Sequence, residues 1–435
     1  MTTNTDTHSP RRMALELLVK TQKAKQFSNI ALDKALESCD LGDADRRLVS
    51  ALFYGVTERL ITLDYRIAQL SSRPMTQIDT HTLNTLRLGL YQLMYMDRIP
   101  PHAAINETVS LCPRRTSGFV NGILRAHTRA GDIVFPDREK SSTEYLSVTF
   151  SVCPALCEKL TDIYGLDRTE SILSAFCEQP PTTVRVNTVR TTRNELAAQI
   201  DGAVFTGLSP NGLRVRGAVR ELYGFSDGLF FVQDEASQIC TQAVGARPGD
   251  TVMDICACPG SKSFGMAMDM KNTGQLFAFD LHAKKLSLIK SGAERLGLDI
   301  INVAVQDGRI PIESFSDTAD RVLCDVPCSG FGVLAKKPEL RYKDPAESAA
   351  LPDIQLGILE NACRYVKRGG TLVYSTCTIF PEENEENIKR FLERHEEFSL
   401  TPFKVGALDV PSGYITLLPD THPTDGFFIA KLTRS

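Results

Sequence analysis

A strand-like run that leads through a small-residue turn into a helix is the feature that most constrains this chain. Residues 251–253 are apolar, residues 254–262 read Asp-Ile-Cys-Ala-Cys-Pro-Gly-Ser-Lys, and a helix-like segment follows over 263–270. Pro259, Gly260 and Ser261 carry little side-chain bulk, so backbone N–H groups there can approach a ligand. Open α/β sheets hold nucleotides at such strand–turn–helix junctions. The turn therefore predicts an α/β domain with a nucleotide-like ligand.

The chain after this turn repeats the same alternation. Strand-like runs at 251–255, 276–281, 301–305, 321–325 and 371–375 alternate with helix-like segments at 263–270, 283–296, 347–366 and 382–394. Repeated β-α units predict a parallel, doubly wound sheet with right-handed crossovers and a ligand crevice at the carboxyl ends of its strands. The runs at 414–418 and 426–432 predict a closing hairpin.

The first part of the chain has a helical period instead. Segments 11–23, 28–38, 43–58, 60–70, 79–96, 103–111 and 117–129 place apolar residues three and four positions apart, with Asp43 and Asp79 as expected N-caps. Residues 131–146 are expected to form a polar linker. Helices at 153–164, 167–177 and 192–200 with strands at 182–188, 212–216 and 229–232 then predict a small α+β unit.

Composition excludes several classes of protein. A chain of 435 residues predicts two or three domains, and no apolar run is long enough for a transmembrane helix. Residues 1–10 lack the apolar segment of a signal peptide, so a cytoplasmic protein without membrane contact is expected. Twelve cysteines without a Cys-x-x-Cys pair disfavour a zinc ribbon or a disulfide scaffold, and no metal site is expected.

Charge is distributed unevenly although the net value is only −4. Residues 1–131 carry 17 Lys and Arg against 12 Asp and Glu, whereas the rest of the chain is acidic. The N-terminal third is therefore the part expected to contact a polyanion, although a mixed surface without a partner has the same charge.

Acidic residues follow several of the predicted strands. Asp280 ends the second strand, Asp307 follows the third, and Asp325 ends the fourth. A carboxylate after the second strand commonly accepts hydrogen bonds from ribose hydroxyls, and Asp307 could face an adenine amino group. A single Asp after a strand is more often a helix cap or turn former, but several at one sheet edge favour a ligand site. No Gly-x-Gly-x-x-Gly or Walker motif is present, which disfavours a dinucleotide or ATP.

Two cysteines lie in turns that follow neighbouring strands. Cys328 stands in Asp-Val-Pro-Cys-Ser-Gly at 325–330, and Cys377 stands in Ser-Thr-Cys-Thr at 375–378. A thiolate is a strong nucleophile, whereas an isolated cysteine is usually a small core residue. Two such turns at one crevice favour nucleophilic chemistry. A cysteine hydrolase lacks support because none of the seven histidines lies in a motif turn.

These motifs together carry a resemblance. Residues 101–109 and 118–125, with 45–46 and 53–56, resemble the signatures of the NusB-like helical RNA-binding domain. The 254–262 turn, 325–330, 374–378 with 383–385, and 425–430 resemble successive motifs of the RsmB/Sun (NOL1/NOP2) family of RNA cytosine-5 methyltransferases. The resemblance implies a class I methyltransferase domain at 236–435, a NusB-like domain at 1–131, and between them, at 145–235, an α+β domain similar to the family's RNA-recognition-like insert.

The resemblance also implies an activity. A monomeric enzyme would methylate C5 of a cytosine in 16S rRNA with S-adenosylmethionine. In this pattern Cys377 is the nucleophile that adds to C6, Cys328 assists release, Asp325 contacts the cytosine edge, and Lys262 lies near cofactor and base. Asp280 and Asp307 would bind ribose and adenine, with Asp325 also at the cofactor. The remaining cofactor contacts would come from Cys256, Ala257, Cys258, Pro259, Gly260 and Ser261.

Two departures from the family pattern have consequences. Cys258 and Ser261 replace the usual second Ala and second Gly of the turn, so Ser261 needs a backbone angle that a non-glycine residue can adopt. Lys336, Lys337, Arg341 and Lys343 either contact phosphates near the crevice or form a solvated loop. Alternative functions are the same chemistry on tRNA or another rRNA cytosine, and a non-catalytic RNA-binding factor.

Overall fold

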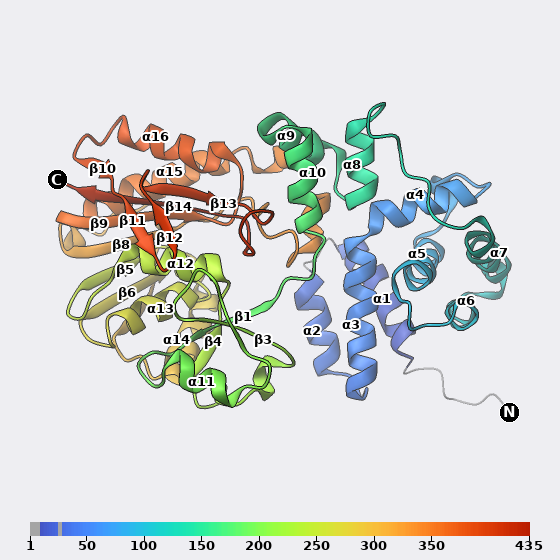
Figure 1. Cartoon of the computed structure of the whole chain (residues 1–435), viewed down its shortest axis with the longest axis horizontal. Helices are drawn as coiled ribbons and strands as arrows, with labels where there is room; N and C mark the ends of the chain where they lie inside the picture. The colour runs from blue at the N-terminus through green and yellow to red at the C-terminus, as the bar shows by residue number, and fades with distance from the viewer. Residues whose placement is uncertain (1–8, 25–27) are drawn as a thin grey trace. The chain divides into compact units, whose positions relative to one another are not determined.

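A computed structural model describes residues 9–24 and 28–435 of the protein (Figure 1). The described chain divides into two compact units. One contains the chain up to Cys177 together with Lys336–Pro345, and the other contains Glu178–Ala335 and Ala346–Ser435. Most of the N-terminal stretch 1–10, on which the expectation of no signal peptide depends, lies outside the described residues.

Helices build the first unit, and the sequence predicts all of them except the one at residues 142–150. They are α1 (Pro10–Ala24), α2 (Ser28–Glu37), α3 (Asp43–Glu58), α4 (Leu60–Leu70), α5 (Thr80–Tyr95), α6 (Pro101–Ser110), α7 (Arg114–Ala130), α8 (Ser142–Phe150), α9 (Pro154–Tyr164) and α10 (Leu166–Ala175). Their apolar faces meet in one core that includes Leu15, Phe53 and Leu124. Apolar spacing of three and four residues produces this result because it places one stripe of each helix toward the others.

Helix ends show where the sequence-based predictions are right and wrong. Asp79 caps α5, since its side chain accepts a hydrogen bond from the backbone N–H of Thr82 at 3.0 Å. Asp43 is not a cap, because Gly42 holds the N-cap position and Asp43 lies inside α3. An acidic residue in the first turn still complements the helix dipole. The linker is shorter than predicted, since α8 begins at Ser142.

The 336–345 segment belongs to the helical unit, although it follows the Cys328 turn in sequence. Arg341 is 2% exposed, and its guanidinium donates to the carbonyls of Phe150 at 2.9 Å and Phe176 at 2.5 Å. These carbonyls lie at the C-terminal ends of α8 and α10, where backbone acceptors lack helical partners. Both alternatives predicted for Arg341, a phosphate contact and a place in a solvated loop, are therefore wrong: its charge satisfies two helix ends instead.

Tyr342 binds the same segment to the helices of this unit through several hydrogen bonds. Its hydroxyl donates to the carbonyl of Thr57 at 2.7 Å and accepts from the N–H of Leu60 at 3.1 Å. The hydroxyl also lies 2.9 Å from Ser151 Oγ. One side chain thus joins the segment to the α3–α4 junction and to the end of α8.

Tyr342→Phe is expected to lower the free energy of unfolding by about 1–3 kcal/mol, because it leaves buried polar groups without a partner. Chemical denaturation followed by circular dichroism measures this change. Tyr223→Phe is the matched control, since Tyr223 is 55% exposed and should cost little. Equal stability of the two variants would contradict the anchoring role of Tyr342.

The second unit opens with a small antiparallel sheet. Its strands are β1 (Thr182–Val186), β2 (Val204–Phe205), β3 (Gly212–Val215) and β4 (Phe230–Val232), in the order β2-β3-β1-β4. Helix α11 (Arg193–Gln199) begins with a capping box formed by Thr192 and Glu195. The sequence predicted all of these elements except β2. Helices α8 to α10, whose residues were predicted outside the helical domain, pack in the first unit. The predicted domain ranges 1–131, 145–235 and 236–435 stay a prediction.

The larger sheet has the strand order β10-β14-β9-β8-β5-β6-β7, with β13 paired to β14. Strands β5 (Thr251–Asp254), β6 (Gln275–Asp280), β7 (Ile301–Val305), β8 (Ala319–Asp325) and β9 (Val366–Thr376) are parallel to their neighbours in this set. Strands β10 (Phe398–Leu400), β13 (Tyr414–Leu417) and β14 (Phe427–Arg434) pair antiparallel, which confirms the closing hairpin. The parallel order reverses at β5, so a crevice at its carboxyl end is expected.

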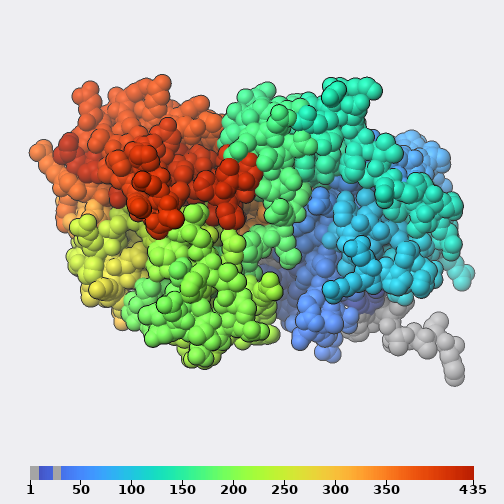
Figure 2. All heavy atoms as spheres, viewed as in Figure 1, coloured from blue at the N-terminus to red at the C-terminus, as the bar shows by residue number. Residues whose placement is uncertain are grey.

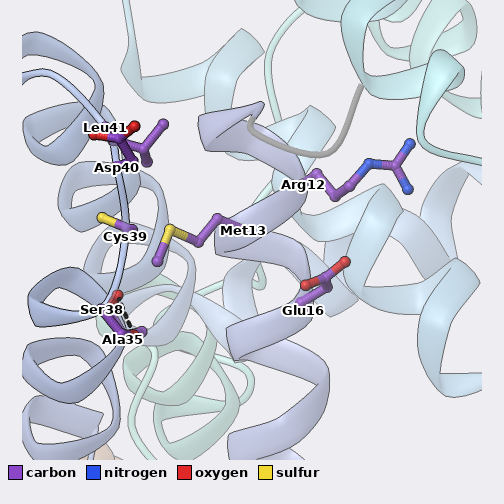
Figure 3. Close-up of a pocket in the computed structure, with 8 residues that line it drawn as sticks. All are labelled: Arg12, Met13, Glu16, Ala35, Ser38, Cys39, Asp40 and Leu41. Atoms are coloured by element: carbon purple, nitrogen blue, oxygen red, sulfur yellow. Dashed lines mark hydrogen bonds between the residues drawn. The ribbon is translucent and has the colours of Figure 1, made fainter. Parts of the chain in front are cut away.

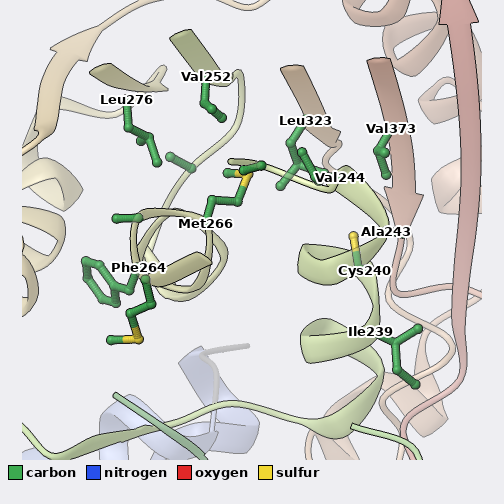
Figure 4. Packing of buried hydrophobic residues seen from close by; sticks show 14 of the residues in the cluster. Ile239, Cys240, Ala243, Val244, Val252, Phe264, Met266, Leu276, Leu323 and Val373 are labelled. Carbon is green, nitrogen blue, oxygen red and sulfur yellow. The ribbon is translucent and has the colours of Figure 1, made fainter. Parts of the chain in front are cut away.

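Helices α12 (Glu235–Val244), α13 (Ser261–Asp269), α14 (Leu286–Leu296), α15 (Leu351–Ala362) and α16 (Glu385–Leu392) complete this unit. Figure 4 shows Ile239 and Cys240 of α12 and Met266 of α13 beneath the strand residues Val252, Leu323 and Val373. A second core contains Met253, Leu359 and Phe391. Two cores that share the sheet's strands fix the strand ends, and therefore the turns that follow them.

The sequence-based prediction missed one hairpin, β11 (Phe403–Val405) and β12 (Leu408–Val410). Each strand has three residues, which is too short to show a period. The buried side chains Phe403 and Val410 join the α12 side of the core. In the space-filling view this red segment lies against green residues of the same unit (Figure 2).

Candidate active site

The turn after β5 has the geometry that its small residues predict. Gly260 has a φ of 109°, and a Cβ there would lie 2.6 Å from Phe264 Cζ. A side chain at this position is therefore excluded both by backbone conformation and by space. Ser261 is the first residue of α13. The substitution of Ser for the usual Gly consequently needs no left-handed backbone.

Asp254 is buried at the end of β5. Its Oδ2 accepts a hydrogen bond from Ser263 Oγ at 2.6 Å, whereas its Oδ1 is buried and has no hydrogen-bond partner in the described part of the chain. Burial raises the pKa of Asp254 from 3.8 to about 7, against the opposing effect of the Ser263 hydrogen bond. This carboxyl group therefore joins strand β5 to the first turn of α13. No pattern in the sequence indicates the Ser263 contact.

An ion pair crosses from the turn to the end of β8. Lys262 Nζ lies 2.6 Å from Asp325 Oδ2, and Ser375 Oγ donates to Asp325 Oδ1 at 2.8 Å. Burial alone would lower the pKa of Lys262, but the charge and hydrogen bond of Asp325, together with the neighbouring Cys240 and Cys377, outweigh burial, and the pKa is raised. The ammonium also lies 5.1 Å from the centre of the Phe427 ring. Residues of β8, β9, α13 and β14 thus meet at one point.

The two candidate cysteines meet beside this pair. Their Sγ atoms are 3.2 Å apart, and the backbone N–H of Cys377 donates to Cys328 Sγ at 3.3 Å. Both side chains are half-buried. The hydrogen bond to Cys377 raises the pKa of Cys328 well above its usual value, and burial raises it further. The two thiols therefore share a site in which a second negative charge is unfavourable.

Backbone and hydroxyl contacts hold the two cysteine turns together. Ser329 Oγ donates to Thr378 Oγ1 at 2.8 Å, and the Gly332 N–H donates to the Cys377 carbonyl at 3.0 Å. The Gly426 N–H in turn donates to the Gly332 carbonyl at 2.7 Å. A Cβ on Gly332 would lie 2.0 Å from the Gly426 carbonyl oxygen, so only glycine fits there. The turn before β14 is therefore packed directly on the segment that follows the first cysteine turn.

The predicted cofactor carboxylates differ in their partners. Asp280 accepts from the backbone N–H of Cys258 at 3.2 Å and of His282 at 2.9 Å. Asp307 is paired with Arg309, whose Nη2 lies 2.7 Å from Asp307 Oδ2. Hydrogen bonds from Arg309 lower the pKa of Asp307 to about 2. The sequence-based prediction did not include this ion pair, although an Arg two positions after an Asp indicates that the two side chains can meet.

The structure thus brings Lys262, Asp325, Cys328 and Cys377 together, with Ser375 and Phe427 as additional members. Cys256 and Cys258 do not join the thiol pair. Burial raises the pKa of Cys256 well above its usual value, and Cys258 Sγ lies 3.4 Å from the Lys285 carbonyl. Both fit the description of small turn residues.

Other kinds of site are scarce in the part of the chain that the structure describes. Within the described residues, no group of three or more His, Cys, Asp or Glu side chains could hold a metal ion. No helix in the described chain is long and apolar enough to cross a membrane. A cavity of about 350 Å³ lies in the helical unit, where Met13 of α1 faces Cys39 (Figure 3). It contains none of the predicted site residues.

The doubly wound sheet, its acidic strand ends and the absence of a glycine-rich phosphate motif define a methyltransferase-type α/β domain. Comparison with protein families agrees. The family model for 16S rRNA methyltransferase RsmB/F matches residues 241–433. The NusB family matches 8–129, and the RsmF/B-like ferredoxin-like domain matches 155–220.

Relatives match the chain over nearly its whole length. The probable ribosomal RNA small subunit methyltransferase B of Bacillus subtilis is 37% identical, over 98% of this chain and 99% of that protein. The ribosomal RNA small subunit methyltransferase B of Escherichia coli is 33% identical, over 91% of this chain and 92% of that protein. The crystal structure of PH0851 has a TM-score of 0.78 at 27% identity and covers 98% of this chain and 99% of that one. The chain belongs to the RsmB/F family of 16S rRNA methyltransferases, which confirms the predicted family and fold class.

The raised pKa of Asp254 predicts how the free energy of unfolding depends on pH. A carboxyl group with a raised pKa holds its proton more tightly in the folded state, so the wild type loses stability as pH rises from about 4 to about 7. Asp254→Asn removes this titration but keeps an oxygen that can accept from Ser263. The stability of the variant relative to wild type should therefore increase over this range by roughly 4 kcal/mol at most. Urea denaturation at several pH values measures the difference, and a difference independent of pH would contradict the assignment.

Proposed function

We propose that this protein methylates C5 of a cytosine in 16S rRNA, with S-adenosylmethionine as methyl donor and Cys377 as covalent nucleophile. The observation that carries the proposal is the pair of thiols 3.2 Å apart, beside a partly buried Lys–Asp ion pair at the carboxyl edge of the sheet. The family membership supports rRNA methylation, whereas the position on the base and the covalent adduct are our inference.

The chemistry explains why a thiol is needed. C5 of cytosine is a poor nucleophile, and addition of the Cys377 thiolate to C6 gives C5 the character of an enamine carbon. After methyl transfer a base takes the C5 proton, and the C6–S bond breaks with its electron pair returning to sulfur. Covalent catalysis of this kind divides one difficult step into easier ones. Cys328, in contact with Cys377, assists the release.

The ion pair has a role in orienting the base. Asp325 Oδ1 and Oδ2 are already held by Ser375 and Lys262, so the carboxylate is fixed in position. A fixed carboxylate can accept from the cytosine amino group and contact its N3 edge. Lys262, close to both the turn and Asp325, lies where cofactor and base would meet. The target cytosine must leave any base stack to reach these groups.

The residues of the turn fit the proposed cofactor. Asp280, Asp307 and Asp325 make the strand ends acidic, and a positively charged sulfonium, ribose hydroxyls and an adenine amino group are complementary to such a set. Gly260 has a φ of 109°, which keeps this turn tight. When bound, S-adenosylmethionine supplies an electrophilic methyl group. We assign ribose to Asp280 and adenine to Asp307, which would require Arg309 to share or release that carboxylate. The turn residues 256–262 complete the set.

The RNA partner follows from the domain composition. We assign 1–131 to a NusB-like RNA-binding domain, 145–235 to the ferredoxin-like domain and 236–435 to the methyltransferase domain. An rRNA substrate implies a cytoplasmic protein, and we expect a monomer that needs no metal. The same chemistry on tRNA or another rRNA site is the nearest alternative. A non-catalytic RNA-binding factor would be favoured if calorimetry detected no binding of S-adenosylmethionine.

Two cysteine variants test the covalent mechanism. Cys328→Ala should accumulate a covalent protein–RNA adduct with cytosine-containing RNA and cofactor, because addition proceeds and release is impaired. Cys377→Ala should form no adduct and should lose activity by several orders of magnitude, as expected for removal of a nucleophile. Denaturing gel electrophoresis detects the adduct. An adduct with Cys377→Ala but not with Cys328→Ala would exchange the two roles.

A further inference from the structure

The carboxylate of Glu383 is buried next to the Cys328 turn. The residue is 1% exposed and ends the short helix η8 (Pro381–Glu383), which follows Cys377 along the chain. Its Oε2 accepts from the backbone N–H of Ser329 at 2.9 Å and from Gln355 Nε2 at 2.7 Å. Its Oε1 is buried and has no hydrogen-bond partner among the described residues. This carboxylate is therefore only half satisfied.

Gln355 links the Glu383 carboxylate to the peptide group that precedes Cys328. Its Nε2 also donates to the Pro327 carbonyl at 3.0 Å. The peptide groups before and after Cys328 are thus both tied to Glu383 Oε2, one through Gln355 and one directly. The hydroxyl of Tyr374, in β9, donates to the backbone carbonyl of Glu383 at 2.5 Å. This hydrogen bond also holds the backbone of Glu383 in place. The Cys328 turn has little freedom to move away from Cys377.

The charge of Glu383 has no compensating cation within the described chain. The contacts of its carboxylate there come from a backbone N–H and an amide, neither of which is charged. Burying a carboxylate without a cation lowers the stability of the fold. A hydrophobic or amide side chain would fill this space with a smaller loss of stability. The negative charge also contributes to the raised pKa of Cys328, after the Cys377 hydrogen bond and burial.

We propose that Glu383 is a positioning residue for methyl transfer: its carboxylate fixes the peptide groups on both sides of Cys328 and adds a negative charge near that thiol. This charge disfavours a second negative charge on Cys328. Two consequences follow. A neutral Cys328 does not compete with Cys377 for C6 of the base. Its S–H also stays available to donate to the Cys377 thiolate when the C6–S bond breaks. This role rests on the covalent mechanism proposed above.

Thiol reactivity tests the charge effect without RNA or cofactor. Wild type, Glu383→Gln and the control Glu386→Gln are treated briefly with iodoacetamide across pH 6 to 10 (roughly the range in which thiols ionise), and alkylation of the Cys328 peptide is measured by mass spectrometry. Glu386 is exposed on α16 and should leave the profile unchanged. Glu383→Gln keeps the acceptor oxygen but loses the charge, so its Cys328 profile should move to lower pH, with about tenfold faster alkylation at pH 8. A profile identical to wild type would overturn the proposal.

Glu383→Asp keeps the charge and is the control for an effect of Glu383→Gln that comes from poor folding. It should restore the wild-type alkylation profile, and a profile like that of Glu383→Gln would contradict the charge effect. In methyl transfer to 16S rRNA, Glu383→Gln should lower kcat about tenfold with an unchanged KM for RNA, and should accumulate a covalent adduct. A change in KM alone would contradict a role at the thiols. If Cys328→Ala forms no adduct, the covalent mechanism fails, while the alkylation result still decides the effect of Glu383 on Cys328.

Discussion

The parallel pairing of β8 with β9 is the constraint on which the site depends. Their register places Asp325 opposite Ser375, so the turns that carry Cys328 and Cys377 leave the sheet side by side. Residues 49 positions apart in sequence are thereby brought to a sulfur–sulfur distance of 3.2 Å. A register shift by one residue would turn one of these side chains to the other face of the sheet. The buried cores on the strands make such a shift costly, since apolar residues would be exposed with it.

Asp325 connects the two halves of the site. One of its oxygens is bound to Lys262 from the turn after β5, and the other to Ser375 from β9. The proposed cofactor side and the proposed nucleophile side therefore share one carboxylate, whose position both sides determine. Glu383 has a comparable place on the far side of the thiols, because it ties the Cys328 turn to the helix that follows Cys377. Preorganised polar groups of this kind reduce the rearrangement needed during the reaction.

The sequence was sufficient for most of the longer elements and for the site's main members. Helical and strand periods located the β-α alternation and the helices of the first unit except α8, and strand ends located Asp280, Asp325, Cys328 and Cys377. Short elements such as β11 and β12 escaped because three residues show no period. Arg341 was expected either at phosphates or in a solvated loop because its neighbours in sequence are polar, and only the fold reveals the helix ends that it satisfies. Contacts such as Glu383 with Ser329 join distant segments and depend on the tertiary structure.

In the proposed mechanism Cys377 forms the bond to the base. The most direct measurement is to incubate the wild-type protein and S-adenosylmethionine with 16S rRNA in which 5-fluorocytidine replaces cytidine. The adduct then cannot lose a proton from C5 and is trapped. Digestion and mass spectrometry locate the modified cysteine. The covalent mechanism predicts a methylated nucleotide on the peptide that contains Cys377, and an adduct on the Cys328 peptide, or none at all, would contradict it.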